Sequence, residues 1–176
     1  IRGIMNNSIY PILPLRRMVI FPDQITKLSL ARKKSISASK VAFANGKNIL
    51  LVPQLNYDLK DVKKAPVYYS VGVLATVYDL VEENGIYNIF ASGIRRVVVK
   101  NVVRGDSYDE AEVEPFIEKD LDAVDVRLLQ QRLVDILSNR ALKEDTFMAE
   151  VEFDADIEKL SAYDLAMQTC AHMPYE

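Results

Sequence analysis

The segment from residue 70 to residue 104 constrains the fold more than any other part of the chain. It reads SVGVLATVYDLVEENGIYNIFASGIRRVVVKNVVR, is rich in Val, Ile, Tyr and Phe, and holds no proline, a composition typical of β-strands. Asn84 and Gly85 lie between alternating apolar runs, and this pair readily adopts the two positive φ angles of a type I′ turn. We therefore expect an antiparallel β-meander, with a third strand led by residues 91–97, where Gly93 allows a bulge or a close backbone approach.

Shorter strands and one helix are expected around this meander. Alternating or short apolar runs bounded by turn residues predict further strands at residues 9–15, 25–30, 48–54 and 108–115. The apolar positions of residues 32–45 fit a short helix, ended by residues that tolerate a left-handed backbone. Residues 55–66 are polar and irregular, and are interpreted as a surface loop. These elements predict a compact, mostly antiparallel β lobe with one helix.

The sequence pattern changes abruptly after Phe116. Apolar residues recur at helical spacing over residues 120–138, and residues 144–153 form a weaker helical segment. Ser161, followed three residues later by Asp164, resembles a capping box that opens a helix over residues 162–172. The second part of the chain is therefore predicted to be helical.

These patterns together predict an α+β fold with two domains. A mostly antiparallel β lobe with one short helix is expected over residues 9–117, and an α-helical lobe over residues 118–176. Residues 1–8 are expected to be a disordered or vector-derived start. Because the chain stops directly after the end of a helix, we expect the native protein to continue past Glu176.

Charge and cysteine content limit the classes of function. The net charge of −3 gives no general affinity for polyanions, yet residues 24–57 hold six basic side chains and no acid. The single cysteine, Cys170, rules out an internal disulfide. The sequence also lacks a signal-peptide pattern and any apolar run long enough to span a bilayer. We expect a cytoplasmic protein with no membrane partner.

The sequence offers no arrangement of residues for catalysis, cofactor binding or metal binding. The lone His172 and lone Cys170 cannot supply the three or four protein ligands of a zinc site. No Gly-x-Ser-x-Gly elbow is present, and the surroundings of Gly46 and Lys47 do not fit a phosphate loop. Five acids lack the spacing of a calcium loop and are interpreted as a solvated strand face: Asp106, Asp109, Glu110, Glu112 and Glu114.

Six short motifs follow one another along the chain: Leu13-Pro14-Leu15-Arg16; Phe21-Pro22; Arg32 with Ser35-Ile36; Leu51-Val52 with Gln54; Val71-Gly72 with Ala75; and Gly93 with Arg95-Arg96-Val97. In this order and spacing they resemble the N-terminal domain of Lon proteases. His172, Met173 and Pro174 also resemble the helix end that precedes a long connecting helix in that family. The resemblance covers the chain from about Ile9 and implies a PUA-like β lobe followed by a helical lobe.

The resemblance also implies a function, which composition and periodicity do not reveal. Lon enzymes are ATP-dependent serine endopeptidases whose ATPase and protease domains lie downstream, so ATP and magnesium are expected there and no cofactor in this chain. This chain is expected to bind unfolded, damaged or degron-tagged proteins and to support assembly of a homo-oligomer, a hexamer in the full-length enzyme. Two alternatives stay open, namely a stand-alone PUA-like binding module and a nucleic-acid binder.

A contact surface for protein substrates is predicted from a loop and the helix start that follows it. The loop offers apolar side chains after an edge-like strand, and the helix start adds charge that would favour acidic partners. The candidate residues are Met18, Ile20, Phe21, Pro22, Arg32, Lys33 and Lys34. An alternative for Phe21 is that it plugs the open end of the β lobe, and the three charges could simply face solvent.

Overall fold

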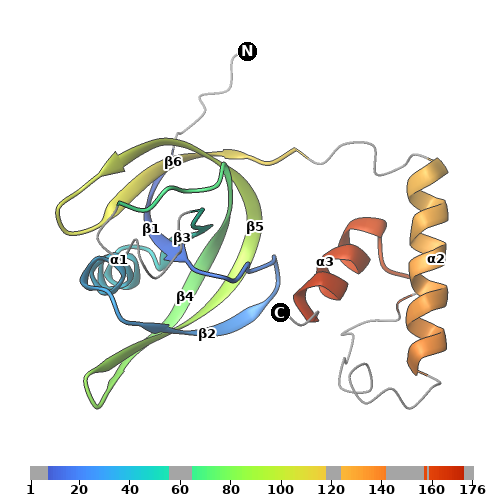
Figure 1. The fold of residues 1–176 in the computed structure, drawn as a ribbon, viewed down its shortest axis with the longest axis horizontal. Coiled ribbons are helices and arrows are strands. Elements are labelled where there is room, and N and C mark those ends of the chain that lie inside the picture. Colours follow the sequence, from blue (N-terminus) through green and yellow to red (C-terminus); the bar gives the residue numbers. More distant parts are fainter. Residues whose placement is uncertain (1–7, 56–64, 118–123, 142–156, 158, 173–176) are drawn as a thin grey trace. The chain divides into compact units, whose positions relative to one another are not determined.

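The computed structural model describes residues 8–55, 65–117, 124–141, 157 and 159–172, and the chain divides into two compact units, Ile1–Phe116 and Ile117–Glu176 (Figure 1). The elements of the first unit are β1 (Ile9–Leu15), β2 (Ile25–Leu30), α1 (Lys33–Ala44), β3 (Asn48–Pro53), β4 (Val71–Glu83), β5 (Ile86–Arg104) and β6 (Asp109–Pro115). The second unit contains α2 (Val124–Ala141) and α3 (Ala162–His172). The predicted α+β class, mostly β with a few helices, is confirmed.

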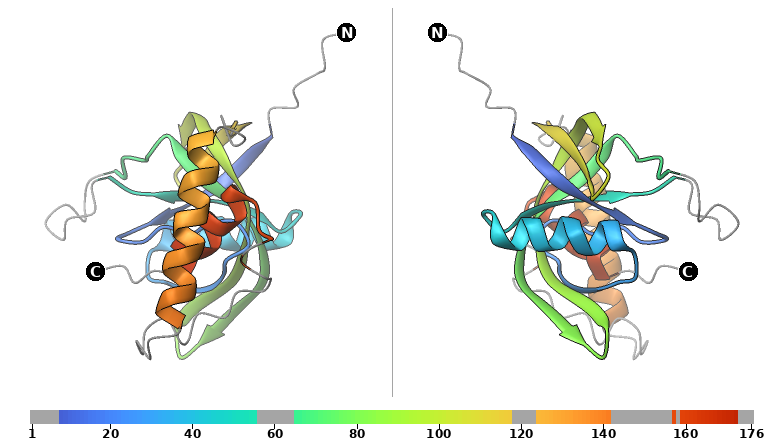
Figure 2. Two further views of the ribbon diagram at one scale, coloured as in Figure 1. Left: turned by 90° about the vertical axis from the view of Figure 1, so that its right-hand side faces the viewer. Right: turned by 90° about the vertical axis from the view of Figure 1, so that its left-hand side faces the viewer.

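The strands of the first unit form a sheet that closes on itself. Their order is β2-β5-β4-β3-β1-β6, and an additional pairing of β5 with β6 completes a ring of five strands. β1 and β3 run parallel, while the other pairs are antiparallel. β2 pairs with β5 alone, so it is the edge strand among the strands that the structure describes. α1 packs against β1, β3 and β4 and crosses the strands on one side of the ring (Figure 2).

β5 is one strand of 19 residues that changes partner along its length. Its first half pairs with β2 and its second half with β6. Ala75 of β4 faces Gly93 while Leu74 faces Arg95, so Ile94 is an extra residue that forms a bulge. The expectation of a separate third strand after residues 91–97 is therefore wrong, because the bulge bends β5 enough to reach a new partner without a turn.

Two predicted turning points of the chain are confirmed. Asn84 and Gly85 have φ angles of 53° and 79° between β4 and β5, as a type I′ turn requires. α1 ends where Gly46 takes a φ of 76° and the N–H of Lys47 donates to the carbonyl oxygen of Ala42 over 2.8 Å. Residues that tolerate a left-handed backbone therefore stop both elements where the sequence places them.

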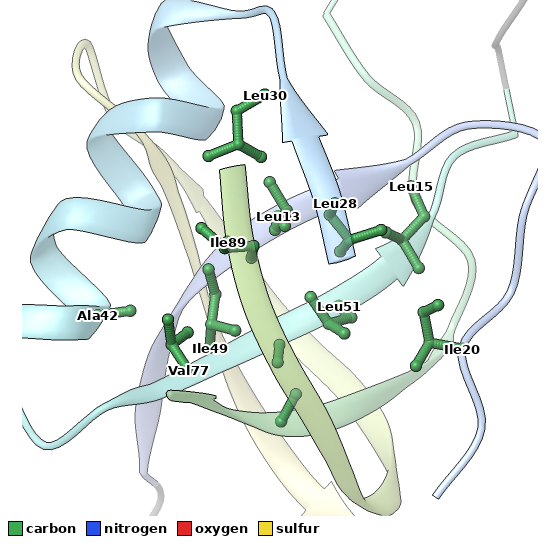
Figure 3. Close-up of a cluster of buried hydrophobic side chains, with 12 residues drawn as sticks. Leu13, Leu15, Ile20, Leu28, Leu30, Ala42, Ile49, Leu51, Val77 and Ile89 are labelled. Atoms are coloured by element: carbon green, nitrogen blue, oxygen red, sulfur yellow. The ribbon is translucent and has the colours of Figure 1, made fainter. Parts of the chain in front are cut away.

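The core of the first unit lies on both faces of β3. Ile49 and Leu51 belong to one buried cluster, which β1, β2 and α1 also line (Figure 3), and Leu50 and Val52 belong to another. All four side chains are fully buried. A strand buried on both faces reads as a continuous apolar run rather than an alternating one. This explains why residues 48–54 predict a strand that lacks a polar face.

The two helices of the second unit pack through a small apolar cluster. Val134 and Leu137 of α2 contact Leu165 of α3. α3 spans Ala162–His172, as the sequence predicts, and the Ser161 hydroxyl oxygen accepts the N–H of Asp164 over 3.1 Å at its start. α2 extends three residues beyond the predicted end at residue 138. Residues 120–123 and the segment 144–153 lie outside the described residues.

Gly93 fixes the contact between β5 and the loop that precedes β2. Its N–H donates to the carbonyl oxygen of Gln24 over 3.1 Å, and its carbonyl oxygen accepts the N–H of Asp23 over 2.9 Å. A Cβ at this position would overlap the carbonyl oxygen of Phe21. The sequence-based expectations of a bulge and of a close backbone approach are therefore both met here.

We predict that Gly93→Ala destabilises the chain by about 1–3 kcal/mol, because a backbone atom must move to admit the methyl group. The free energy of unfolding from urea titration measures the effect. Ser92→Ala, one residue away and half-buried, serves as the matched control and should change stability by less than about 0.5 kcal/mol. An equal loss in both variants would show that crowding at Gly93 is not the cause.

Candidate functional site

The loop between β1 and β2 is held in a defined conformation. The N–H of Phe21 donates to Oε1 of Gln24 over 3.0 Å, and the N–H of Gln24 returns a 3.3 Å bond to the carbonyl oxygen of Phe21. Arg17 and Asp23 take positive φ angles of 53° and 63° at the two ends of this segment. Together with the bonds to Gly93, these contacts present the loop as a fixed surface.

The structure divides the predicted apolar contact residues into buried and accessible ones. Ile20 is 1% exposed within the core, and Pro22 is also buried. These two residues anchor the loop and cannot contact a partner, which corrects the sequence-based prediction. Met18 is half-buried and packs against the core cluster. Phe21 is half-buried but is not among the residues that pack against that cluster in the described part of the chain.

The predicted basic residues have three different environments at the start of α1. Arg32 is the half-buried N-cap residue, and its Nη1 lies 3.5 Å from Oε1 of Gln54. Lys33 is exposed. Lys34 is also exposed, but its ammonium group donates to the carbonyl oxygen of Gly105 over 2.6 Å and to Oδ1 of Asp109 over 3.1 Å. Lys34 thus ties α1 to the segment between β5 and β6.

Asp109 is the centre of a polar cluster, which overturns its interpretation as part of a solvated strand face. Its side chain is 2% exposed and accepts bonds from Lys34, from the Tyr68 hydroxyl over 2.9 Å and from Nη1 of Arg104 over 2.9 Å. Arg104 also donates to the carbonyl oxygen of Pro66 over 2.5 Å. A single carboxylate therefore joins α1, β5, β6 and the segment before β4.

The same cluster shifts two pKa values in opposite directions. Burial alone would raise the pKa of Asp109, but the hydrogen bonds from Lys34 and Tyr68 and the charges of Lys34 and Arg104 outweigh it and lower the pKa. Burial is the largest cause that raises the pKa of Tyr68 far above its ordinary range, and the hydrogen bond to Asp109 is the second. Asp109 is therefore ionised and Tyr68 is a neutral donor at neutral pH.

The predicted contact surface falls into two parts joined by β2. The loop that contains Met18 and Phe21 precedes Ile25, whereas Arg32 and Lys33 follow Leu30. The six residues of β2 span roughly 20 Å. The outer edge of β2 lies between the two parts, and Ile25 on this strand is 75% exposed. The structure thus connects the predicted residues through a sheet edge rather than gathering them in one pocket.

Sequence reasoning missed two residues at the neighbouring ends of the paired strands β1 and β3. Arg16 directly follows β1, and Gln54 directly follows β3. The N–H of Gln54 donates to the carbonyl oxygen of Leu15 over 2.8 Å, and its side chain is buried. Both residues occur in the short motifs on which the family resemblance depends, but no spacing in the sequence reveals that Gln54 contacts Arg32 and also bonds to Leu15, the residue before Arg16.

We predict that Asp109→Asn lowers the free energy of unfolding at pH 7 by about 1–3 kcal/mol, because charge-assisted bonds to Lys34 and Arg104 are lost. Urea titration measures the change. The matched control is Glu114→Gln, which removes a partner of Lys100 at 3.4 Å in a pair that is about half exposed on both sides. It should cost less than about 1 kcal/mol.

The difference between wild type and Asp109→Asn should also depend on pH. Because folding lowers the pKa of Asp109 below its ordinary value of 3.8, the carboxylate stabilises the fold above about pH 4 and this contribution is lost as pH falls through the folded-state pKa. The two stability curves should therefore converge in acid. A difference that stays constant down to pH 2 would show that Asp109 stabilises the fold through its shape rather than its charge.

Comparison with known proteins agrees with this architecture. The family model described as the ATP-dependent protease La (LON) substrate-binding domain matches residues 9–176. The N-terminal domain of a Mycobacterium avium complex Lon protease superposes with a TM-score of 0.72 at 17% identity, covering 96% of this chain and 84% of that one. A Lon N-terminal domain protein from Xanthomonas campestris gives a TM-score of 0.50 at 16% identity, covering 95% of this chain and 99% of that one. At these identities the likeness concerns the fold.

Sequence relatives are whole Lon proteases of much greater length. Lon protease of Rhizobium meliloti (strain 1021) is 32% identical over 129 residues, which are 73% of this chain and 16% of the relative. Lon protease 3 of Sorangium cellulosum (strain So ce56) is 26% identical over 153 residues, 84% of this chain and 18% of the relative. Within the described residues, no helix is long and apolar enough to cross a membrane.

The chain spans less than a fifth of the length of these curated relatives. Because the family model matches residues 9–176, the chain belongs to the family of Lon protease N-terminal substrate-binding domains.

Proposed function

We propose that this domain holds extended segments of unfolded, damaged or degron-tagged proteins along the outer edge of β2. The observation that carries this proposal is the position of β2 at the end of the strand order, with a hydrogen-bonded neighbour only on the β5 side among the described strands. An edge strand offers backbone donors and acceptors to any extended polypeptide, whatever its sequence. A domain that must accept many different substrates needs this kind of recognition.

Side chains around the edge supply the apolar part of the binding surface. Ile25 is 75% exposed, and Val19 in the preceding loop is 39% exposed. Phe21 is half-buried in the same loop. Unfolded and damaged proteins differ from folded ones in exposing apolar side chains, so apolar groups beside a free edge favour them. An extended segment of six or seven residues would reach from this loop to Arg32.

The greater length of the relatives supports a proposal about the wider role of the domain. We propose that the domain belongs to a longer, cytoplasmic, ATP-dependent serine endopeptidase, in which ATP and magnesium act outside this chain. The domain would deliver substrates without catalysing their cleavage and would support assembly of a homo-oligomer. Support for these proposals comes from the family of the chain and from the Lon proteases that it matches.

We predict that Ile25→Ser weakens binding of an unfolded protein by about threefold to tenfold, since an exposed apolar contact is removed. Fluorescence anisotropy with labelled, reduced and carboxymethylated casein measures the affinity. The matched control is Ile86→Ser at the tip of the β4–β5 hairpin, where Ile86 is 53% exposed. This control should bind casein as wild type does, and equal weakening of both variants would argue against the β2 edge.

Phe21→Ala separates the two hypotheses for this residue. Because Phe21 lies outside the group that packs on the core, we expect a melting temperature within about 2 °C of wild type and a clear loss of casein affinity. A residue that plugs the barrel would instead cost roughly 3–5 kcal/mol of stability. A folded variant with unchanged affinity would remove Phe21 from the binding surface.

A further inference from the structure

Two arginines lie close to Gln54, where the parallel strands β1 and β3 end. Arg16 directly follows Leu15, whose carbonyl oxygen accepts the N–H of Gln54 over 2.8 Å. Oε1 of the Gln54 side chain in turn accepts a hydrogen bond from Nη1 of Arg32 over 3.5 Å. Gln54 is 3% exposed. The backbone and side chain of one buried amide residue therefore link the segments that carry Arg16 and Arg32.

Both arginines contain N–H groups that are shielded from solvent and lack an acceptor. These groups are Nε and Nη2 of Arg16 and Nη2 of Arg32, none of which has a hydrogen-bond partner among the residues that the structure describes. A guanidinium group keeps its proton in a protein, so neither arginine can become neutral to avoid the cost of its unpaired donors. Shielded donors without acceptors are costly, and an anion that accepts their bonds would offset the cost.

The surroundings add positive charge without supplying that anion. Lys33 is exposed beside Arg32, and the first turn of α1 holds no acid. Arg32 is the N-cap residue but forms no side-chain cap, so the positive end of the helix dipole faces the same region. Asp109, the carboxylate bound to Lys34, is already engaged by Arg104 and Tyr68. The region therefore has an excess of cations around unfilled donors.

We propose that Arg16 and Arg32 form a receptor for a carboxylate of the protein substrate. A planar guanidinium fork matches the two oxygens of a carboxylate, and two such forks can hold one group from both sides. Both side chains are only partly buried as whole residues, so a change of side-chain rotamer can turn the shielded N–H groups toward a ligand. The carboxylate would come from an Asp or Glu side chain or from the C-terminus of the substrate.

This inference rests on the proposed function and adds a preference to it. β2 runs from Ile25 to Leu30 and leads directly into Arg32. A substrate segment paired along the edge of β2 would have its apolar residues near Ile25 and would bring a residue five or six positions away to the arginines. The domain would then select extended segments in which a carboxylate lies at this distance from an apolar residue.

Four labelled peptides test the proposal by fluorescence anisotropy with the complete 176-residue chain. They share one unstructured apolar segment and differ in having Glu or Gln six positions from an apolar anchor, each with a free or an amidated C-terminus. We expect the Glu peptides to bind wild type about tenfold more tightly than the Gln peptides. If the C-terminus is the source instead, amidation will remove the preference and the Glu-to-Gln change will not. Either result supports the receptor.

Arginine variants assign the preference to this site. In Arg16→Gln and in Arg32→Gln the preference should fall to less than twofold, while the amidated Gln peptide, which has neither carboxylate, should bind much as before. Arg32→Lys keeps the charge but not the fork and should retain only part of the preference, which provides a second variant if Arg16→Gln does not fold. Arg132→Gln removes an exposed positive charge from α2 and should keep the full preference.

Three results would overturn the proposal. Equal affinity of all four peptides for wild type would exclude a carboxylate receptor while leaving binding along β2 intact, because Ile25→Ser would still weaken that binding. A preference that persists in both Arg16→Gln and Arg32→Gln would place the receptor elsewhere. Tight, salt-sensitive binding of a single-stranded oligonucleotide that is lost in both variants, without any peptide preference, would assign the arginines to nucleic acid.

Discussion

The bend of β5 at Gly93 is the constraint on which the first unit depends. Before the bend β5 pairs with β2, and after it β5 pairs with β6, which then reaches β1 and completes the ring. The absence of a Cβ at Gly93 lets the loop before β2 lie directly against the strand. Gly93 therefore fixes the loop that we assign to substrate binding at the point where the bulge at Ile94 lets β5 change partner and the sheet close.

Features made by residues close together in the chain could be predicted from the sequence. The turn at Asn84 and Gly85 and the helix cap at Ser161 and Asp164 depend on backbone preferences that neighbouring residues set. Strand positions could also be predicted, because apolar residues in short runs must be buried somewhere. The continuity of β5 could not be predicted, since it depends on β6, a partner that the local pattern around Gly93 does not reveal.

Properties that several distant segments create together could not be predicted from the sequence. Asp109 lies in an acid-rich segment beside Glu110, yet Lys34, Tyr68 and Arg104 converge on it from three other segments and make it a buried centre. Ile20 belongs to a loop that looks exposed, but the fold directs it into the core. The sequence shows that the residues around the start of α1 are basic. Only the structure shows that Lys34 is already bonded to Asp109, while Nη2 of Arg32 has no acceptor among the described residues.

The pairing of β1 has a consequence for how the chain folds during synthesis. Ile9 pairs with Glu112 and Ile12 with Leu50, so β1 must wait first for β3 and then for β6, which both follow it in the chain. The β4–β5 hairpin needs only a two-residue turn and can form as soon as both strands have emerged, because local contacts require little loop closure. β1 then adds with β3 and β6, at the cost of ordering a long intervening segment. Until β6 is made, β1 can pair on the β3 side only, and the unpaired edge of this apolar strand leaves the nascent chain prone to aggregation.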